Sequence, residues 1–221
     1  MSNSEYSHQE LRDAICKVGY MLWSRTMVAA NDGNITAKVD DNLILSTPTG
    51  VSKGQLTPDK LIVMNLDGDI IEPAPSGIHK PTSEVKMHLR MYRVNPDIKA
   101  CVHAHPLHGT AFAIKGEALT KKMMPESVIA MPEIPLAPYG TPSTEAVPDS
   151  VEPFAFTHKV ALLEQHGALS WGSDVWDAYF QMERLEYTAQ LTFLTRMING
   201  ERELPADEIE KLIGMRAQYG L

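Results

Sequence analysis

The sequence is poor in cysteine, with only Cys16 and Cys101 among its 221 residues. Two cysteines cannot build the disulfide framework of a small secreted domain, so a reducing, cytoplasmic setting is expected. The sequence also lacks an apolar run of about 18 residues, which excludes a membrane-spanning helix. Its first residues show no basic stretch followed by an apolar one, so no secretory signal is expected.

Clusters of lysine and arginine are absent as well. The net charge is −8, which disfavours binding to nucleic acid or to an anionic membrane. Hydrophobic residues make up 43% of the chain and charged residues 22%, fractions that are ordinary for a folded protein and exclude a disordered one. Without a visible linker or repeat, residues 1–221 are expected to form one domain.

The pattern of apolar residues predicts an alternation of helices and short strands. Helices are predicted over 8–25, from about 82 to 94, and over 107–115, 173–198 and 205–216. Strands are predicted over 35–39, 43–46, 61–65, 69–72, 98–105, 160–164 and 168–171. The proline-rich residues 125–142 are expected to be a strand piece within loops. These elements predict an α/β fold, a three-layer sandwich whose central, largely antiparallel sheet is flanked by helices.

Two histidines, His103 and His105, alternate along the predicted strand 98–105. Residues two apart face the same side of a strand, so both imidazoles can reach one metal ion. A further ligand must come from another segment, and His166, which follows the apolar run 160–164, is the best candidate. Three histidines that leave one position open are typical of catalytic Zn²⁺, although Mn²⁺, Co²⁺ or Fe²⁺ would accept similar ligands.

Other interpretations of these residues exist. A His-x-His pair also occurs as an exposed patch at a strand edge, without a metal. Cys101 shares the face of His103 and could be a ligand, but a free buried cysteine is commoner. The remaining histidines are expected to be surface or core residues: His8, His79, His88, His108 and His158.

A second informative segment is the helix start at Thr82, Ser83 and Glu84. Its hydroxyl and backbone N–H groups could bind an anion, or the hydroxyl groups could only cap the helix. Glu84 lies where the helix dipole favours a negative charge, as a solvated glutamate also would. The loops at Gly33-Asn34 and Thr49-Gly50 offer further backbone donors. Together these segments could bind phosphate through backbone dipoles, hydroxyl groups and the metal rather than through a Lys/Arg cluster.

Five motifs, in this order and across nearly the whole chain, resemble the class II aldolase/adducin family. They are Gly33-Asn34-Ile35-Thr36, Thr47-Pro48-Thr49-Gly50, Pro81-Thr82-Ser83-Glu84, His103-Ala104-His105-Pro106 and Gln165-His166-Gly167. The resemblance implies a zinc ion bound by His103, His105 and His166, with Glu84 as fourth ligand and as catalytic acid/base. It implies that the substrate phosphate is bound by Gly33, Asn34, Thr49, Gly50, Thr82 and Ser83. It also implies a cyclic homotetramer with active sites between subunits.

The family members that the chain most resembles are aldolases that cleave ketose 1-phosphates, such as L-fuculose 1-phosphate. Glu84 agrees with this, because related L-ribulose-5-phosphate 4-epimerases usually carry aspartate there. Tyr219 resembles a C-terminal tyrosine that closes the aldolase site, although a frayed terminal tyrosine can also be inert. A second tyrosine of these aldolases, which protonates the leaving aldehyde oxygen, has no counterpart in residues 124–131.

Several rival functions share this scaffold. A 4-epimerase would break the same bond and re-form it on the other aldehyde face. A decarboxylase of a 3-oxo-sugar-acid phosphate would stabilise a similar enolate, and a dehydratase of a thio-sugar phosphate is a further alternative. A non-catalytic, adducin-like binding module would keep the fold without the metal ligands, whereas this sequence contains all four.

Overall fold

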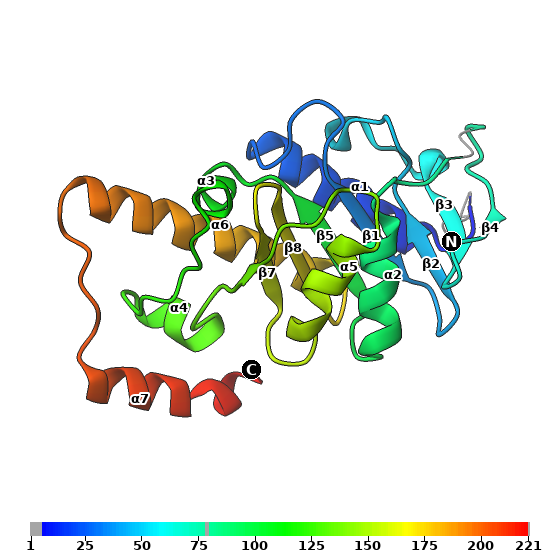
Figure 1. Ribbon diagram of the computed structural model, residues 1–221. Helices are drawn as coiled ribbons and strands as arrows, with labels where there is room; N and C mark the ends of the chain where they lie inside the picture. The colour runs from blue at the N-terminus through cyan, green and yellow to red at the C-terminus, as the bar shows by residue number, and fades with distance from the viewer. Residues whose placement is uncertain (1–5, 78–79, 221) are drawn as a thin grey trace.

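A computed structural model describes residues 6–77 and 80–220. Its centre is an eight-stranded sheet in the order β4-β3-β2-β1-β5-β8-β7-β6 (Figure 1). The strands are β1 (Asn34–Lys38), β2 (Leu43–Ser46), β3 (Ile62–Asn65), β4 (Ile70–Glu72), β5 (Ala100–Ala104), β6 (Leu136–Ala137), β7 (Val160–Leu163) and β8 (Gly167–Gly172). Each neighbouring pair is antiparallel except β6 and β7, so the predicted, largely antiparallel sheet is confirmed.

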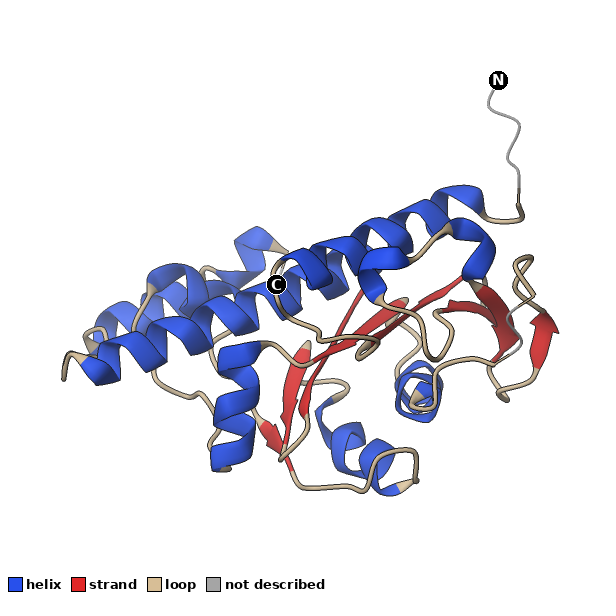
Figure 2. Ribbon diagram, turned by 90° about the horizontal axis from the view of Figure 1, so that it is seen from above, coloured by secondary structure: helices blue, strands red, loops and turns tan. Residues whose placement is uncertain are grey.

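Helices cover both faces of this sheet (Figure 2). They are α1 (Gln9–Ser24), α2 (Val85–Val94), α3 (Leu107–Lys115), α4 (Pro125–Ala130), α5 (Ala146–Val151), α6 (Val175–Met197) and α7 (Ala206–Gly214). The described residues also include the 3₁₀ turns η1 (Lys53–Gln55), η2 (Pro58–Lys60), η3 (Glu152–Phe154) and η4 (Arg216–Tyr219).

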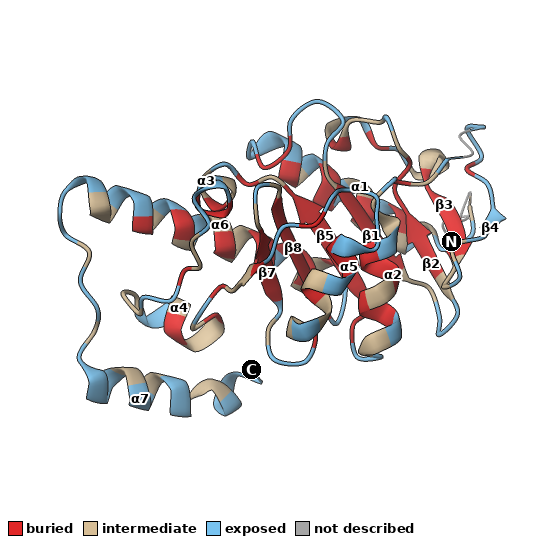
Figure 3. Cartoon of the chain, viewed as in Figure 1, coloured by how far each residue is buried: buried red, intermediate tan, exposed pale blue. Residues whose placement is uncertain are grey.

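Two separate apolar cores lie on the two faces of the sheet. One joins the sheet to α1, α3 and α6, and the other joins it to α2 and α5. Neighbouring residues of β5 alternate between them, because Val102 belongs to the first core and Cys101 to the second. The predicted three-layer sandwich is therefore confirmed, and Figure 3 shows the buried residues concentrated in the strands and on the inward faces of the helices.

The long helix α6 begins where the sequence predicts. Asp174 is its N-cap, and the Asp174 carboxylate accepts hydrogen bonds of 2.8 Å from the backbone N–H groups of Trp176 and Asp177. In the parts of the chain that the structure describes, no helix is both long and apolar enough to cross a membrane.

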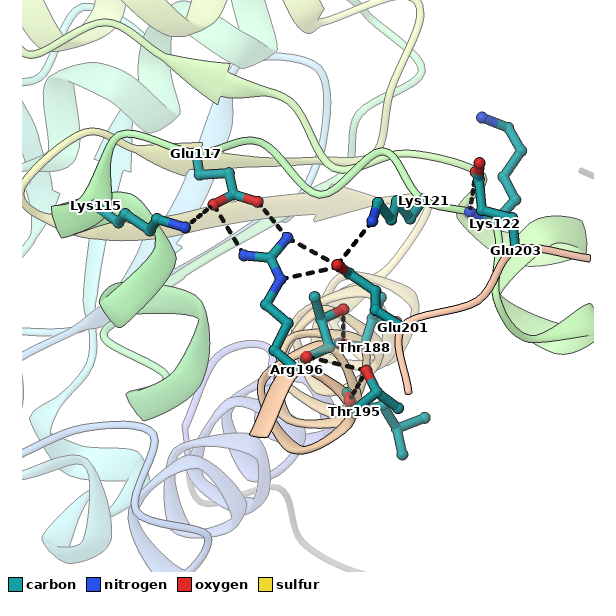
Figure 4. Close-up of polar contacts among 11 residues, drawn as sticks. Lys115, Glu117, Lys121, Lys122, Thr188, Thr195, Arg196, Glu201 and Glu203 are labelled. Carbon is teal, nitrogen blue, oxygen red and sulfur yellow. Dashed lines mark hydrogen bonds and ion pairs between the residues drawn. The ribbon is translucent and has the colours of Figure 1, made fainter. Parts of the chain in front are cut away.

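The segment after α6 is held against the segment after α3 by a network of charged side chains (Figure 4). Arg196, near the end of α6, donates hydrogen bonds to the carboxylates of Glu117 and Glu201. The backbone N–H of Leu204 donates to the carbonyl of Lys122 at 2.9 Å. Helix α7 follows and packs against α4, and none of its residues is buried.

The prediction for residues 125–142 was incomplete. This region contains the short helix α4 as well as the short strand β6. Pro125 begins α4, where a residue without an N–H costs nothing, so this proline starts a helix rather than preventing one. The helix expected from about Thr82 begins at Val85, with Glu84 in the N-cap position.

Candidate metal centre

Strand pairing in the middle of the sheet brings the three histidines together. His103 lies on β5 and His105 follows its end, while His166 directly precedes β8. Ala104 pairs with Ala168 in the antiparallel register of these strands, so the turn that carries His166 lies beside His105. One ligand nitrogen from each ring lies within 4.8 Å of the others. The predicted meeting of His103, His105 and His166 is confirmed.

Glu84 reaches the same point from the start of α2. Its Oε2 lies 3.1 Å from Nε2 of His103, and its Oε1 lies 3.1 Å from Nε2 of His166. The side-chain amide of Asn34 donates to Oε2 of Glu84 at 3.3 Å. The carboxylate thus bridges two imidazoles and is oriented by an amide from β1.

The outward nitrogens of two rings are held by oxygen atoms. Nδ1 of His103 lies 2.9 Å from the carbonyl oxygen of Ala168, and Nδ1 of His105 lies 3.4 Å from Oδ2 of Asp32. A ring that donates from Nδ1 directs the lone pair of its Nε2 inward, which is the arrangement that metal-binding histidines use.

The inward atoms fit a metal ion better than they fit one another. Nε2 of His103 and Nε2 of His105 are only 3.2 Å apart, and both face the region of the Glu84 carboxylate. Two lone pairs and a carboxylate at this separation repel one another unless a proton or a metal cation lies between them. Three imidazole nitrogens and one carboxylate oxygen are ligands that a divalent metal accepts. The triad therefore forms a site suited to a divalent metal.

The electrostatics of the site favour the protonation states that a metal requires. Burial raises the pKa of Glu84, but hydrogen bonds and charge interactions with His103 and His166 outweigh it and hold that pKa well below its usual range. Burial lowers the pKa of His105 to about 4, and the neighbouring His103 and His166 act in the same direction. At neutral pH the carboxylate is thus ionised and His105 is neutral, as metal ligands must be.

Glycine is required at one turn beside the centre. A Cβ atom at Gly167 would lie 2.6 Å from the carbonyl oxygen of Ala104 and 2.6 Å from Cδ2 of His105. The turn that carries His166 can therefore approach β5 closely only because residue 167 has no side chain.

The segments predicted to bind phosphate lie next to Glu84. The backbone N–H of Thr49 donates to the carbonyl of Lys80, and that of Thr82 donates to the carbonyl of Thr47, both at 3.1 Å. These bonds hold the loops at 47–50 and 80–83 side by side. Gly50 is exposed and has a φ of +74°, with open space where a side chain would stand.

The remaining predicted phosphate ligands differ in exposure. Asn34 is buried and contacts Glu84, whereas Ser83 is exposed. Thr82 is buried and its hydroxyl accepts a 3.3 Å hydrogen bond from the backbone N–H of Glu84, so it also stabilises the helix start. Gly33 has a φ of +73°, which suits the turn before β1.

Residues 13–193 match the sequence profile of the Class II Aldolase and Adducin N-terminal domain. The chain belongs to the class II aldolase/adducin family. A 3-oxo-tetronate 4-phosphate decarboxylase of Haemophilus influenzae is 32% identical over 186 residues, which cover 82% of this chain and 86% of the relative. An L-fuculose phosphate aldolase of Methanococcus maripaludis is 33% identical and covers 80% of this chain and 93% of its own.

The fold agrees with solved structures of this class II aldolase family. An L-fuculose 1-phosphate aldolase superposes with a TM-score of 0.85 over 100% of both chains, and its 23% identity shows a shared fold. Decarboxylases and aldolases are thus related to this chain at similar identity. The predicted membership of the family is confirmed. The chain is, however, about as similar to the decarboxylases as to the fuculose aldolases that it was expected to resemble most.

Two residues considered for the site lie away from it in a single chain. Tyr219 ends η4, is 60% exposed and follows Arg216, which donates to the carbonyl of Ile129 in α4. Figure 1 shows this C-terminal segment below the sheet, whereas α3, which follows His105 in the chain, lies beside the sheet at the height of the upper ends of β7 and β8. Cys101 is buried in the core under α2 and is not part of the histidine cluster. Burial raises the pKa of the Cys101 thiol, which disfavours a thiolate ligand.

The other described histidines are not part of the metal cluster. His8 is exposed, His158 pairs with Glu133, and His108 pairs with Glu186. His88 is fully buried on α2, where its Nδ1 lies 2.8 Å from the hydroxyl of Thr36, and burial lowers its pKa to about 3. His79 lies outside the described residues.

Sequence reasoning missed Asp32, which faces His105, and the buried Lys53, which contacts the loops at 31–34 and 49–51. Asp32 stands in a turn motif, Asn31-Asp32-Gly33-Asn34, whose composition indicates only a loop. Lys53 donates its hydrogen bonds to backbone carbonyls, which leave no pattern in a sequence.

Proposed function

We propose that the protein is a metal-dependent lyase that breaks a carbon–carbon bond of a phosphorylated ketose. The first candidate reaction is retro-aldol cleavage of a ketose 1-phosphate, such as L-fuculose 1-phosphate, to dihydroxyacetone phosphate and a short aldehyde. The observation that carries the proposal is the Glu84 carboxylate, 3.1 Å from each of two imidazoles of a three-histidine site. Zn²⁺ is the ion that we propose for this site.

The ion and the chain would divide the chemistry between them. A divalent cation held by His103, His105 and His166 would supply Lewis-acid stabilisation of negative charge that develops on the substrate's carbonyl oxygen. Glu84, oriented by Asn34, would carry the proton to and from the neighbouring carbon. No lysine is needed as a nucleophile in this reaction.

The phosphate loops would orient the substrate rather than take part in bond cleavage. Hydroxyl groups of Thr49, Thr82 and Ser83, the Asn34 amide and the backbone N–H groups at Gly33 and Gly50 would bind the phosphate. Fixing this end of the ketose places its carbonyl group at the metal and its reacting carbon at Glu84.

Retro-aldol cleavage also requires a group that removes the proton of the hydroxyl whose oxygen becomes the aldehyde. We propose that Tyr219 of a neighbouring subunit contacts the aldehyde end of the substrate. Tyr219 lies away from the metal centre of its own chain, so it would have to reach the metal centre of another. The proposal therefore includes a homotetramer with active sites between subunits.

A second candidate is decarboxylation of a 3-oxo-sugar-acid phosphate. Within the described part of one chain, Tyr219 does not lie beside Glu84. Residues 124–131 contain no tyrosine that could take its place. Loss of CO₂ leaves no hydroxyl proton to remove, so a single acid at the carbon suffices. The decarboxylase relative of Haemophilus influenzae supports this candidate as well.

One experiment separates these functions. The purified protein is analysed for metal and then incubated with fuculose, rhamnulose and ribulose 1-phosphates and with a 3-oxo-tetronate 4-phosphate, while aldehyde and CO₂ are measured. We expect bound metal and aldehyde release. Bound metal with CO₂ release alone would establish the decarboxylase. A well-folded protein that binds no metal would instead be an adducin-like binding module, and the proposal would be wrong.

A further inference from the structure

Lys53 is a buried cation without a carboxylate partner among the described residues. The residue is 1% exposed, and its Nζ donates hydrogen bonds to the carbonyl oxygens of Asn31 at 3.0 Å and of Val51 at 2.6 Å. Asp32 interacts with it electrostatically but forms no ion pair with it in this part of the structure. Burial lowers the pKa of Lys53 to about 8, which reflects the cost of a charge in these surroundings.

The backbone that carries Lys53 is locked in place. A Cβ atom on Gly19 of α1 would lie 2.8 Å from the carbonyl oxygen of Lys53. A Cβ atom on Gly54 would lie 2.5 Å from the ring of Trp23. The turn η1 therefore packs directly on α1, and this packing fixes the backbone from which the Lys53 side chain extends.

The two carbonyl acceptors belong to the two loops that the phosphate proposal uses. Asn31 precedes Gly33 and Asn34, and Val51 directly follows Thr49 and Gly50. One ammonium group thus joins both loops. In the second loop, Gly50 is exposed and has open space beside it.

A buried charge is unfavourable unless an opposite charge compensates it. A phosphate dianion at the loops would supply that charge, whereas the backbone carbonyls supply only partial charges. We propose that Lys53 is a positioning residue for phosphate, fixing the loops at 31–34 and 49–51 and placing a positive charge beside them. This inference rests on the proposed phosphate site and adds a cation to a site for which the sequence indicated no Lys/Arg cluster.

The test is calorimetric titration of the metal-loaded protein with inorganic phosphate. We expect Lys53→Met to bind phosphate at least about ten-fold more weakly than the unchanged protein. Lys60→Met is the matched control, because Lys60 also donates to a backbone carbonyl, that of Gln55 at 2.6 Å, but this acceptor belongs to neither loop. Its phosphate affinity should stay within about two-fold.

A purely structural role for Lys53 makes a different prediction. It predicts a lower melting temperature without phosphate and an unchanged affinity for phosphate. We expect instead that Lys53→Met loses the rise in melting temperature that phosphate causes in the unchanged protein. If Lys53→Met binds phosphate as tightly as the unchanged protein, the inference is wrong, even where aldehyde release upholds the proposed function.

A second pair of variants keeps the test decisive if Lys53→Met does not fold. Lys53→Arg retains the charge, whereas Lys53→Gln retains only a hydrogen-bond donor. We expect phosphate affinity within about three-fold for the arginine variant and at least about ten-fold weaker for the glutamine variant. Equal affinities would overturn the inference. An unchanged protein that binds no phosphate, yet releases aldehyde, would overturn the phosphate site and Lys53 together but leave the lyase.

Discussion

At the scale of single residues, the metal centre depends on which nitrogen each imidazole turns inward. The carbonyl of Ala168 and the carboxylate of Asp32 hold the outward nitrogens of His103 and His105. His166 has no such support in the described structure, because its Nδ1 is buried without a hydrogen-bond partner. Its position therefore depends mainly on the turn before β8 and on the atoms that its Nε2 faces.

His166→Ala should remove the metal and leave the fold. Two histidines and one carboxylate remain, and we expect metal affinity to fall by about 100-fold or more. Metal content measured by mass spectrometry, together with circular dichroism of the metal-free protein, checks both parts. His158→Ala is the control, because His158 pairs with Glu133 away from the centre. Full metal content in His166→Ala would remove His166 from the ligand set.

Glu84→Gln should keep the fold and most of the metal but stop proton transfer. The amide has nearly the shape of the carboxylate but cannot act as a base, so hydrogen exchange at the reacting carbon of dihydroxyacetone phosphate should slow by about 10²–10⁴-fold. Exchange into deuterated water is followed by NMR, with Glu133→Gln as the control. Exchange at the unchanged rate would show that another group carries the proton.

At the scale of helices and strands, the connection between α6 and α7 is held by charges. The side chains of Arg196, Glu117 and Glu201 are 29%, 29% and 16% exposed, so their pairing is partly shielded from solvent (Figure 4). Hydrogen bonds from Arg196 lower the pKa of Glu117 to about 2. A carboxylate with a lowered pKa stabilises the fold above its unfolded pKa of about 4.5, and this contribution disappears as the pH falls through about 2.

Arg196→Met should therefore destabilise the protein in a way that depends on pH and salt. We expect a loss of about 1 kcal/mol in the free energy of unfolding at pH 7 and low salt. The difference from the unchanged protein should shrink in high salt and toward pH 2. Urea unfolding at several pH values measures it, with Lys211→Met on the exposed surface of α7 as the control. A loss that is independent of pH and salt would indicate packing rather than charge.

Much of this architecture can be predicted from the sequence, because the strands are short apolar runs bounded by turn residues. The alternation of His103 and His105 places both rings on one face, and this is a local property of the chain. Helices α4 and α5 were missed for another reason. Proline in a sequence usually predicts the absence of a helix. Pro125, however, begins α4 and Pro148 lies within the first turn of α5, where proline is tolerated.

The partners of the site could not be predicted in the same way. The contact of Asp32 with His105 and the bonds of Lys53 exist only once distant loops pack together. The convergence of Glu84 with His166 was expected from family motifs, since neither periodicity nor spacing relates the start of α2 to the turn before β8. Such contacts depend on the tertiary fold and leave no local pattern.

At the scale of the whole molecule, α6 and the residue that follows it expose large apolar side chains. They are Phe180, Tyr187, Phe193, Leu194, Met197 and Ile198. A series of this kind on a single chain is typical of a surface that another subunit covers. It agrees with the proposed homotetramer of 24.5 kDa chains.

Leu194→Glu should weaken this association. Leu194 is 48% exposed, so a charge there is tolerated in the free chain but would be unfavourable in an apolar contact between subunits. Light scattering after gel filtration should show four chains for the unchanged protein and a smaller particle for the variant. Ile71→Glu on the exposed edge strand β4 is the control. A monomeric unchanged protein would contradict the tetramer, and with it the assignment of Tyr219 to a neighbouring site.

The metal donors stand on segments that lie far apart in the sequence, at the start of α2, along β5 and before β8. An unfolded chain cannot offer them together, so the native state alone gains the free energy of binding the ion. Cellular availability of the metal would then govern how long the protein survives, as well as whether it is active. Loss of the ion would leave the fold in place but with a smaller free energy of unfolding, so proteases would reach its open form more often.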